Sequence, residues 1–143
     1  MRWLRVAFVF AVYALVAATS ADAKIIPRLD KRVAARGQRV VVNFGEGAGA
    51  YLAPLEVYLV RTAVEPRVTR RTDSRLRFVG RLGRNGNPIV VNRMSFRVPH
   101  LPAGEYTLAV WFKGSETGRW HNLSEGLWRD ATFGPRLRLR ITS

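Results

Sequence analysis

The side chains of this 143-residue chain that could bind a metal ion are few. The sequence contains two histidines, His100 and His121, no cysteine, and Met94 as its only methionine after Met1. Metal sites in small proteins are usually built from three or four His, Cys or carboxylate ligands. We therefore predict no metal site and no cofactor, and we keep metal or small-molecule carriage only as a trailing alternative.

Nucleophiles and acid–base groups form no recognisable constellation either. His121, Ser124 and Glu125 are close in the sequence, but no nucleophile-elbow pattern surrounds them, as a Ser-His-acid triad would favour. The glycine-rich residues 45–50 lack the Gly-Lys-Ser/Thr of a phosphate-binding loop. Paired carboxylates of the glycosidase type could come from five residues, of which nothing in the sequence selects two: Glu46, Glu56, Glu105, Glu116 and Asp130. We predict that the protein is not an enzyme.

The stretch 114–135 is the best candidate for a binding site, because it is long and shows no regular period. Loops of more than about 12–15 residues are usually functional or disordered. Aromatic side chains beside arginine are favoured at binding surfaces, and they can stack on sugar rings or bases. The alternative is that the tryptophans fold down as a lid over one end of the domain. The candidate residues are Arg119, Trp120, His121, Trp128 and Arg129.

The net charge of +14 points to acidic partners. A strongly cationic surface attracts nucleic acid, anionic lipid head groups and acidic polymers. The alternative is a compositional bias of the genome, because Arg outnumbers Lys 21 to 3. Two groups of arginines alternate with apolar residues and are predicted to form cationic rows on outer sheet surfaces. These candidate polyanion contacts are Arg75, Arg77 and Arg81, and Arg136, Arg138 and Arg140.

The elements that must position these side chains are β-strands. Apolar residues alternate with polar ones along most of the chain, and no segment after residue 23 keeps a helical period over three turns. Asn85-Gly86 predicts a hairpin that joins two of the strands. Residues 24–37 form either a lead-in arm or a short strand at 25–27, and residues 61–74 a loop. The predicted strands are 38–44, 55–60, 75–82, 89–98, 105–113 and 136–142.

The pattern of short strands separated by turns predicts an all-β fold. Six or seven such strands favour a single antiparallel Greek-key sandwich, or a small barrel. The turn "LPAGEY" (101–106) precedes a strand whose Leu108 and Val110 face the same way as Tyr106. A tyrosine at this point can bury its ring and bond its hydroxyl to backbone a few residues upstream, which is a tyrosine corner. We predict this structural role for Tyr106 rather than a catalytic one.

The stretch F-x-V-P-x-L-P-A-G-E-Y-x-L-x-V-W (96–111) resembles the region between strands E and F of immunoglobulin-like and fibronectin-III-like domains. Together with "RLRFVG" (75–80), it is similar to small secreted immunoglobulin-like proteins of high-GC Gram-positive bacteria, most of which have no assigned function. The resemblance covers about residues 38–113. It implies an immunoglobulin-like sandwich and leaves function open, because such sandwiches serve many roles.

Residues 1–23 are predicted to be a secretory signal peptide preceding the domain at 38–143. Arg2 and Arg5 start it, an uncharged apolar run of 13 residues (6–18) follows, and Ala21 and Ala23 occupy the small-residue positions of a cleavage site. The run is too short for a membrane span. We therefore expect a secreted or cell-envelope-associated, non-catalytic module that binds an anionic or carbohydrate surface polymer. The alternative is an accessory immunoglobulin-like domain that contacts another protein, for instance by edge-strand pairing.

Overall fold

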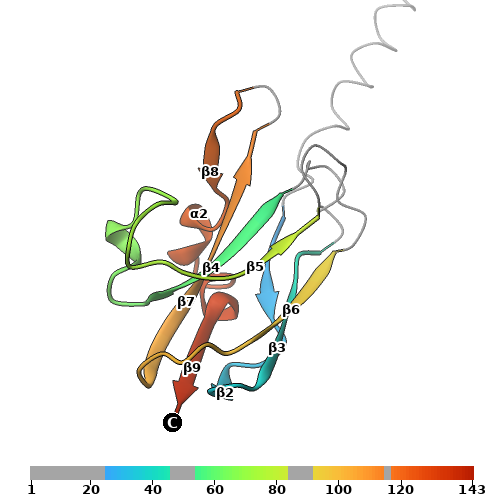
Figure 1. Ribbon diagram of the computed structural model, residues 1–143. Helices are drawn as coiled ribbons and strands as arrows, with labels where there is room; N and C mark the ends of the chain where they lie inside the picture. The colour runs from blue at the N-terminus through green and yellow to red at the C-terminus, as the bar shows by residue number, and fades with distance from the viewer. Residues whose placement is uncertain (1–24, 46–53, 84–91, 115–116) are drawn as a thin grey trace, which may run out of the picture.

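The computed structural model in Figure 1 describes residues 25–45, 54–83, 92–114 and 117–143. The predicted signal peptide and most of the predicted Asn-Gly turn lie outside these residues, as does most of the glycine-rich stretch. No helix in the described part of the chain is long and apolar enough to cross a membrane.

Two β-sheets make up the architecture of the described residues. The smaller sheet has the order β1-β3-β6, with β1 (Arg28–Leu29), β3 (Arg39–Asn43) and β6 (Arg93–Arg97). The larger sheet has the order β2-β9-β7-β4-β5, with β2 (Val33–Ala35), β9 (Arg138–Thr142), β7 (Gly104–Lys113), β4 (Leu55–Arg61) and β5 (Arg77–Leu82), and β8 (Trp120–Asn122) also pairs with β7. The predicted strands are thus confirmed with small shifts of their ends, except that residues 89–91 of the predicted strand 89–98 lie outside the described residues.

The core lies between the two sheets and follows the alternation of the sequence. Val40 and Val42 of β3 and Leu108 and Val110 of β7 belong to one core cluster, and all four are fully buried. The other fully buried residues of the two inner faces include Leu55, Val57, Leu59, Leu139 and Ile141. The predicted immunoglobulin-like β-sandwich is therefore observed, with two sheets packed face to face.

The N-terminal segment of the domain contributes a strand to each sheet. β1 pairs with β3 in the small sheet, and β2 pairs in parallel with β9 in the large sheet. The strand considered at 25–27 is not formed, because Ile25 is buried in the core and Pro27 has no N–H to give to a ladder. All other strand pairs are antiparallel.

The prediction of a hairpin between the strands at 75–82 and 89–98 is wrong. β5 pairs with β4 in the large sheet, whereas β6 pairs with β3 in the small sheet. The two strands meet across the sandwich instead of along an edge, since a Cβ placed on Gly80 would collide with the Met94 side chain. Met94, Phe96 and the following Val98 do share the inner face, as predicted.

A third layer covers the outer face of the large sheet. Val60, Thr107 and Ala109 belong to that face and are buried, although strand alternation predicted them to point outward. The cover comes from residues 62–76, which include the 3-10 helix η2 (Glu65–Arg67), and from the segment around Trp128, which lines a small pocket together with Glu65 and Val68. The stretch 114–135 is therefore not irregular, because it contains β8 and the short helix α2 (Glu125–Trp128), and a second 3-10 helix, η3 (Gly134–Leu137), follows.

The turn before β7 is a tyrosine corner, as predicted. The Tyr106 hydroxyl donates a hydrogen bond of 2.7 Å to the Pro102 carbonyl, and the ring is buried. Gly104 has φ +148°, and a side chain there would meet the Arg61 guanidinium, which itself lies 5.0 Å from the Tyr106 ring centroid. Tyr106 thus ties the turn to the strand that carries the middle of the core.

We expect Tyr106→Phe to lower the free energy of unfolding by about 0.5–1.5 kcal/mol, because one hydrogen bond is lost while the ring stays in place. Chemical denaturation measures this change through the midpoint at constant slope. An unchanged midpoint would show that the hydroxyl bond contributes nothing to the corner.

Candidate binding surfaces

Trp128, one of the predicted binding residues, completes the edge of β7. β9 pairs with residues 104–107 of this strand and β8 with residues 111–113, which leaves 108–110 without a strand on that edge. The Trp128 indole donates to the Leu108 carbonyl at 3.0 Å, and the Val110 N–H donates to the Ser124 hydroxyl at 3.0 Å. Trp128 is 5% exposed, so it is a core residue that fills the edge of β7, and it does not form a lid over an end of the sandwich.

The other residues predicted in this stretch do not gather at one site. Trp120 is half-buried, with the Arg71 guanidinium 4.1 Å from its ring centroid. His121 follows it on β8, points to the opposite side, and lies 5.2 Å from the Phe112 ring. Arg119 and Arg129 are exposed, and Arg129 borders a small pocket beside Trp128.

We expect Trp128→Phe to destabilise the fold by about 1–3 kcal/mol, because the buried Leu108 carbonyl loses its donor. Binding of acidic polymers should be unchanged at temperatures where the variant is folded. Thermal denaturation, together with retention on a heparin column, tests both parts. A folded variant of normal stability with reduced retention would instead place Trp128 in a binding site.

The first predicted arginine row does not exist, because β5 contains a bulge. The register against β4 shifts between Val57 and Tyr58, so that Gly80 and Phe78 face consecutive residues of β4. The bulge turns Phe78 to the outer face, where it is 51% exposed, and it separates Arg77 from Arg81. Arg75 precedes the strand and pairs with Asp73 at 2.7 Å, and its hydrogen bonds lower the pKa of Asp73 to about 2.

The second predicted row, on β9, is only partly formed. Arg138 and Arg140 are exposed on one face of the strand, whereas Arg136 belongs to η3 and lies 5.6 Å from the Phe133 ring centroid. Arg140 pairs with Glu105 at 2.6 Å. β9 and β5 belong to the same sheet, but β7 and β4 and the layer that covers them separate the two groups.

A different set of arginines does share one face, on the outer side of the small sheet. Arg39 of β3 lies directly opposite Arg97 of β6, and Asn43 lies opposite both Arg28 of β1 and Arg93 of β6. Partners in a ladder project to the same side of the sheet. We call Arg28, Arg39, Arg93 and Arg97 the cationic sheet face. All four are exposed, and none forms an ion pair within the described part of the chain.

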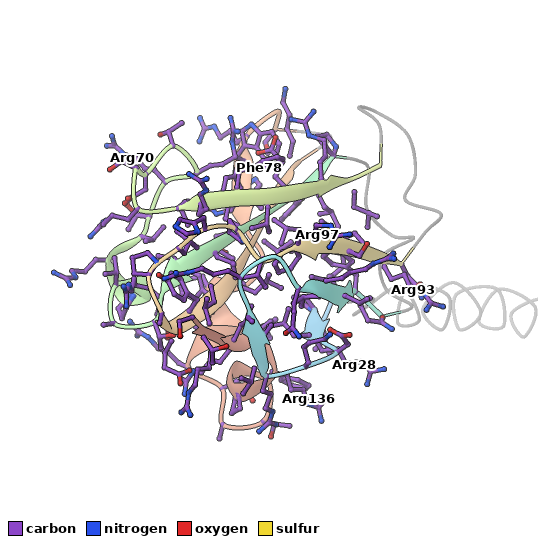
Figure 2. All side chains as sticks on the ribbon, turned by 60° about the horizontal axis from the view of Figure 1, so that its bottom comes forward. Arg28, Arg70, Phe78, Arg93, Arg97 and Arg136 are labelled. Carbon is purple, nitrogen blue, oxygen red and sulfur yellow. The ribbon has the colours of Figure 1, made fainter. Side chains whose placement is uncertain are left out.

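The cationic sheet face includes a surface groove. The groove has a volume of about 520 Å³ and is lined by Arg28, Leu29, Asp30, Val41, Asn43 and Arg93. Figure 2 shows Arg28, Arg93 and Arg97 over the small sheet, away from Arg70. The sequence did not predict this face, although "RVVVN" and "RMSFR" each alternate arginine with inward apolar residues. Only the pairing of β3 with β6 brings the two segments together.

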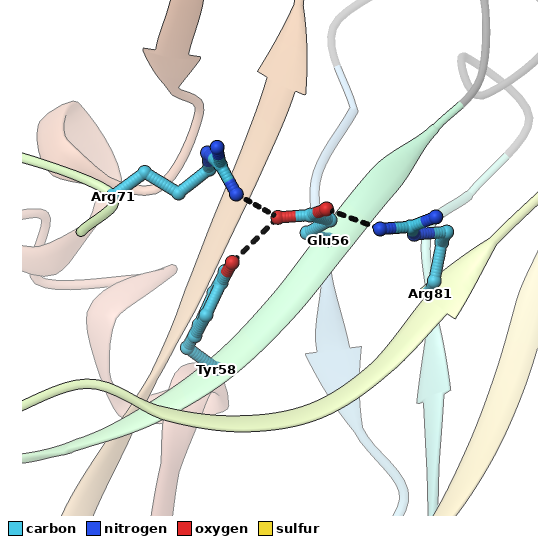
Figure 3. Close-up of polar contacts among 4 residues, drawn as sticks. All are labelled: Glu56, Tyr58, Arg71 and Arg81. Carbon is cyan, nitrogen blue, oxygen red and sulfur yellow. Dashed lines mark hydrogen bonds and ion pairs between the residues drawn. The ribbon is translucent and has the colours of Figure 1, made fainter. Parts of the chain in front are cut away.

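A polar cluster on the outer face of the large sheet was also missed. The Glu56 carboxylate is 3% exposed and accepts hydrogen bonds from Tyr58, from Arg71 at 2.9 Å and from Arg81 at 2.7 Å. Figure 3 shows Tyr58 and Arg71 on one carboxylate oxygen and Arg81 on the other. Burial by itself raises the pKa of Glu56, but these hydrogen bonds outweigh it and hold the pKa below 4.5. Burial and the bond to Glu56 raise the pKa of Tyr58.

The cluster joins the covering segment to the sheet. Arg71 belongs to residues 62–76, whereas Glu56 and Tyr58 belong to β4 and Arg81 to β5. The ionised Glu56 has no proton to donate, and both of its oxygens already accept hydrogen bonds from Tyr58, Arg71 and Arg81. The raised pKa of Tyr58 makes its hydroxyl a poor acid. The geometry therefore favours anchoring or binding over proton transfer.

The lowered pKa of Glu56 predicts a pH-dependent stability. An ionised Glu56 stabilises the fold above pH 4.5, and this contribution is lost as the pH falls through the lowered pKa. We expect Glu56→Gln to cost about 1–3 kcal/mol near neutral pH. The difference from the unaltered protein should shrink as the pH falls below 4.5 and through the lowered pKa of Glu56. Urea denaturation across this range measures it. The exposed Glu105, changed to Gln, is the control and should show little difference at any pH.

Comparisons with known proteins leave the function open. No family model matches this chain, and no curated protein matches it. Among solved structures, that of T. fusca AA10A aligns with a TM-score of 0.40 and 11% sequence identity, over 79% of this chain and 52% of that chain. This chain thus spans about half the length of that protein. The function must be argued from the residues of the chain itself.

Proposed function

We propose that the protein is an exported, non-catalytic module that binds an acidic polymer through the cationic sheet face. The observation that supports this is a single sheet surface with four exposed arginines, of which none is ion-paired within the described residues. Arg39 and Arg97 stand directly opposite each other on paired strands. Like charges in this position destabilise a sheet, and an acidic ligand between them would remove that cost.

The shape of the surface suits an extended polymer. Neighbouring strands are about 4.8 Å apart, and the arginines lie in two rows that run across the sheet. Ser95 and Val41 lie between the rows on the same face, so small and uncharged side chains leave the guanidinium groups accessible. Arginine pairs bidentately with carboxylate, sulfate and phosphate groups. An acidic polysaccharide or a polyol phosphate of a cell surface would supply such groups at regular spacing.

Export is the part of the proposal that rests on the N-terminal sequence. The basic start, the apolar run and the alanines at 21 and 23 support secretion with cleavage after Ala23. A secreted cationic module would meet acidic polymers at a cell envelope.

The alternative, contact with another protein by edge-strand pairing, has less support. β5 is an edge strand of the large sheet, but its bulge and its exposed arginines are features that protect an edge from further pairing. The opposite edge, β2, has only three residues. We therefore favour the polymer-binding function.

The experiment compares two triple variants that remove the same charge. Arg39, Arg93 and Arg97 are changed to Gln in one variant, and Arg136, Arg138 and Arg140 in the other. Binding to heparin is measured as a function of salt concentration. We expect the first variant to lower the slope of log affinity against log salt by about 2–3, since each charge contact contributes roughly 0.7–0.9 on a polyanion such as nucleic acid.

We expect the second variant to change the slope much less, because Arg138 and Arg140 belong to β9 of the large sheet and Arg140 is already paired with Glu105. Circular dichroism confirms that both variants are folded. Equal slopes for the two variants would contradict the proposal and would indicate attraction by net charge alone.

A further inference from the structure

Three buried hydrogen-bond donors on the outer face of the large sheet have no acceptor. They are the indole Nε1 of Trp111, the amide Nδ2 of Asn122 and the Nε of Arg71, and no hydrogen-bond partner for them exists among the described residues. Trp111 is 4% exposed. Buried polar groups in proteins are nearly always satisfied. One acceptor, the Glu65 Oε2, is also unsatisfied among the described residues, but Glu65 lines a pocket with Val68 and Trp128 and not with these donors. The three unsatisfied donors therefore require an explanation of their own.

The sheet register brings these donors together. Trp111 of β7 lies directly opposite Glu56 of β4 on one side and directly opposite Asn122 of β8 on the other. Side chains of directly opposite residues lie on the same face and within a few ångströms of each other. Arg71 contacts Glu56 and also Trp120 of β8, so its side chain must extend over β7, which lies between those two strands.

The chemistry of the three groups specifies what can satisfy them. Indole and guanidinium nitrogens donate and cannot accept. Asn122 uses its amide oxygen to accept from the Ser124 backbone N–H and hydroxyl, so its NH₂ group alone is free. Arg71 donates to Glu56 through Nη1. The other edge of the guanidinium group, which carries the Nε–H, is not used in this bond, and such an edge can bind an oxyanion through two parallel hydrogen bonds.

The charge of the cluster also favours an anionic ligand. One carboxylate, Glu56, faces two guanidinium groups, those of Arg71 and Arg81. Lys113 lies opposite Trp120 on the same face and is exposed. The cluster therefore has an excess of positive charge beside donors that lack an acceptor. A neutral ligand would leave this excess uncompensated.

We propose that Trp111, Asn122 and Arg71 form a second binding site, specific for a single oxyanion group: a carboxylate, sulfate or phosphate. The side chain of Arg71 is 30% exposed, and this side chain gives the site its opening to solvent. The site lies on the outer face of the large sheet, whereas the cationic sheet face lies on the outer side of the small sheet. This inference rests on the proposed function in one point: the acidic groups of the polymer that binds the cationic sheet face would also supply the oxyanion for this site.

The test uses small anions, which cannot bridge the cationic sheet face. The purified protein is titrated calorimetrically with sodium glucuronate, sulfate or phosphate at constant ionic strength, and glucose serves as the neutral probe. We expect saturable binding of at least one anion at one site and no binding of glucose. The three anions distinguish a carboxylate from a sulfate or phosphate source.

Three variants locate the site. Asn122→Asp keeps the oxygen that Ser124 needs and replaces the donor by a negative oxygen, so we expect anion binding to weaken at least tenfold. Trp111→Phe and Arg71→Lys each remove one unpartnered N–H and should weaken binding severalfold. Arg75→Lys is the matched control for Arg71→Lys, because Arg75 belongs to the same segment and pairs with Asp73. It should bind normally.

The outcomes separate this inference from the proposed function. Absence of saturable binding for all three anions would overturn the second site, as would equal binding by the unaltered protein and by Asn122→Asp. Either result leaves heparin binding through the cationic sheet face intact. If Asn122→Asp loses anion binding while its salt-dependent retention on heparin is unchanged, the second site is established independently. Thermal unfolding of each variant confirms that it is folded at the temperature of the titration.

Discussion

The backbone of β7 imposes the constraint on which most of the structure depends. This strand is ten residues long, and its residues from 106 to 111 are buried on both faces. A buried backbone N–H or C=O without a partner is costly, so both edges must be filled. β4 satisfies one edge along seven residues. The other edge requires three different partners: β9, the Ser124–Trp128 segment and β8.

The third layer follows from the same constraint. Ser124 and Trp128 form hydrogen bonds with the edge of β7, so the chain between β8 and β9 must return to this edge. This part of the chain forms the short helices α2 and η3. The segment 62–76 closes the rest of the outer face and is held by Arg71 on Glu56. A carboxylate in this layer is tolerated because two guanidinium groups and a phenol satisfy it. The same layer contains three buried donors that have no acceptor among the described residues.

Electrostatics divide the molecule into two unlike surfaces. On the large sheet, acidic residues offset many arginines: Glu56 pairs with Arg71 and Arg81, and Glu105 with Arg140. On the small sheet, the acidic Asp30 lies beside the groove but its carboxylate accepts from the Val41 N–H, and the arginines of the cationic sheet face have no ion pair with any residue that the structure describes. The net charge of +14 is therefore unevenly distributed between paired and unpaired groups. The unpaired positive charge that a ligand could bind is concentrated on the cationic sheet face.

The sequence by itself determined the strands, their inward faces and the tyrosine corner, because these follow from a two-residue period and from local turn chemistry. Val40, Phe96 and Leu139 are buried as the alternation predicted. The two-residue alternation predicts the inward face of a single strand, however, and it does not predict which strands pair with each other. The tertiary structure alone decided that β6 pairs with β3, which places Arg39 opposite Arg97. It also decided the bulge in β5, which inverts the faces that alternation predicted and removes the arginine row expected there. For Trp128 the sequence left a binding role and a packed role open, and the gap on the edge of β7 decided that it is buried.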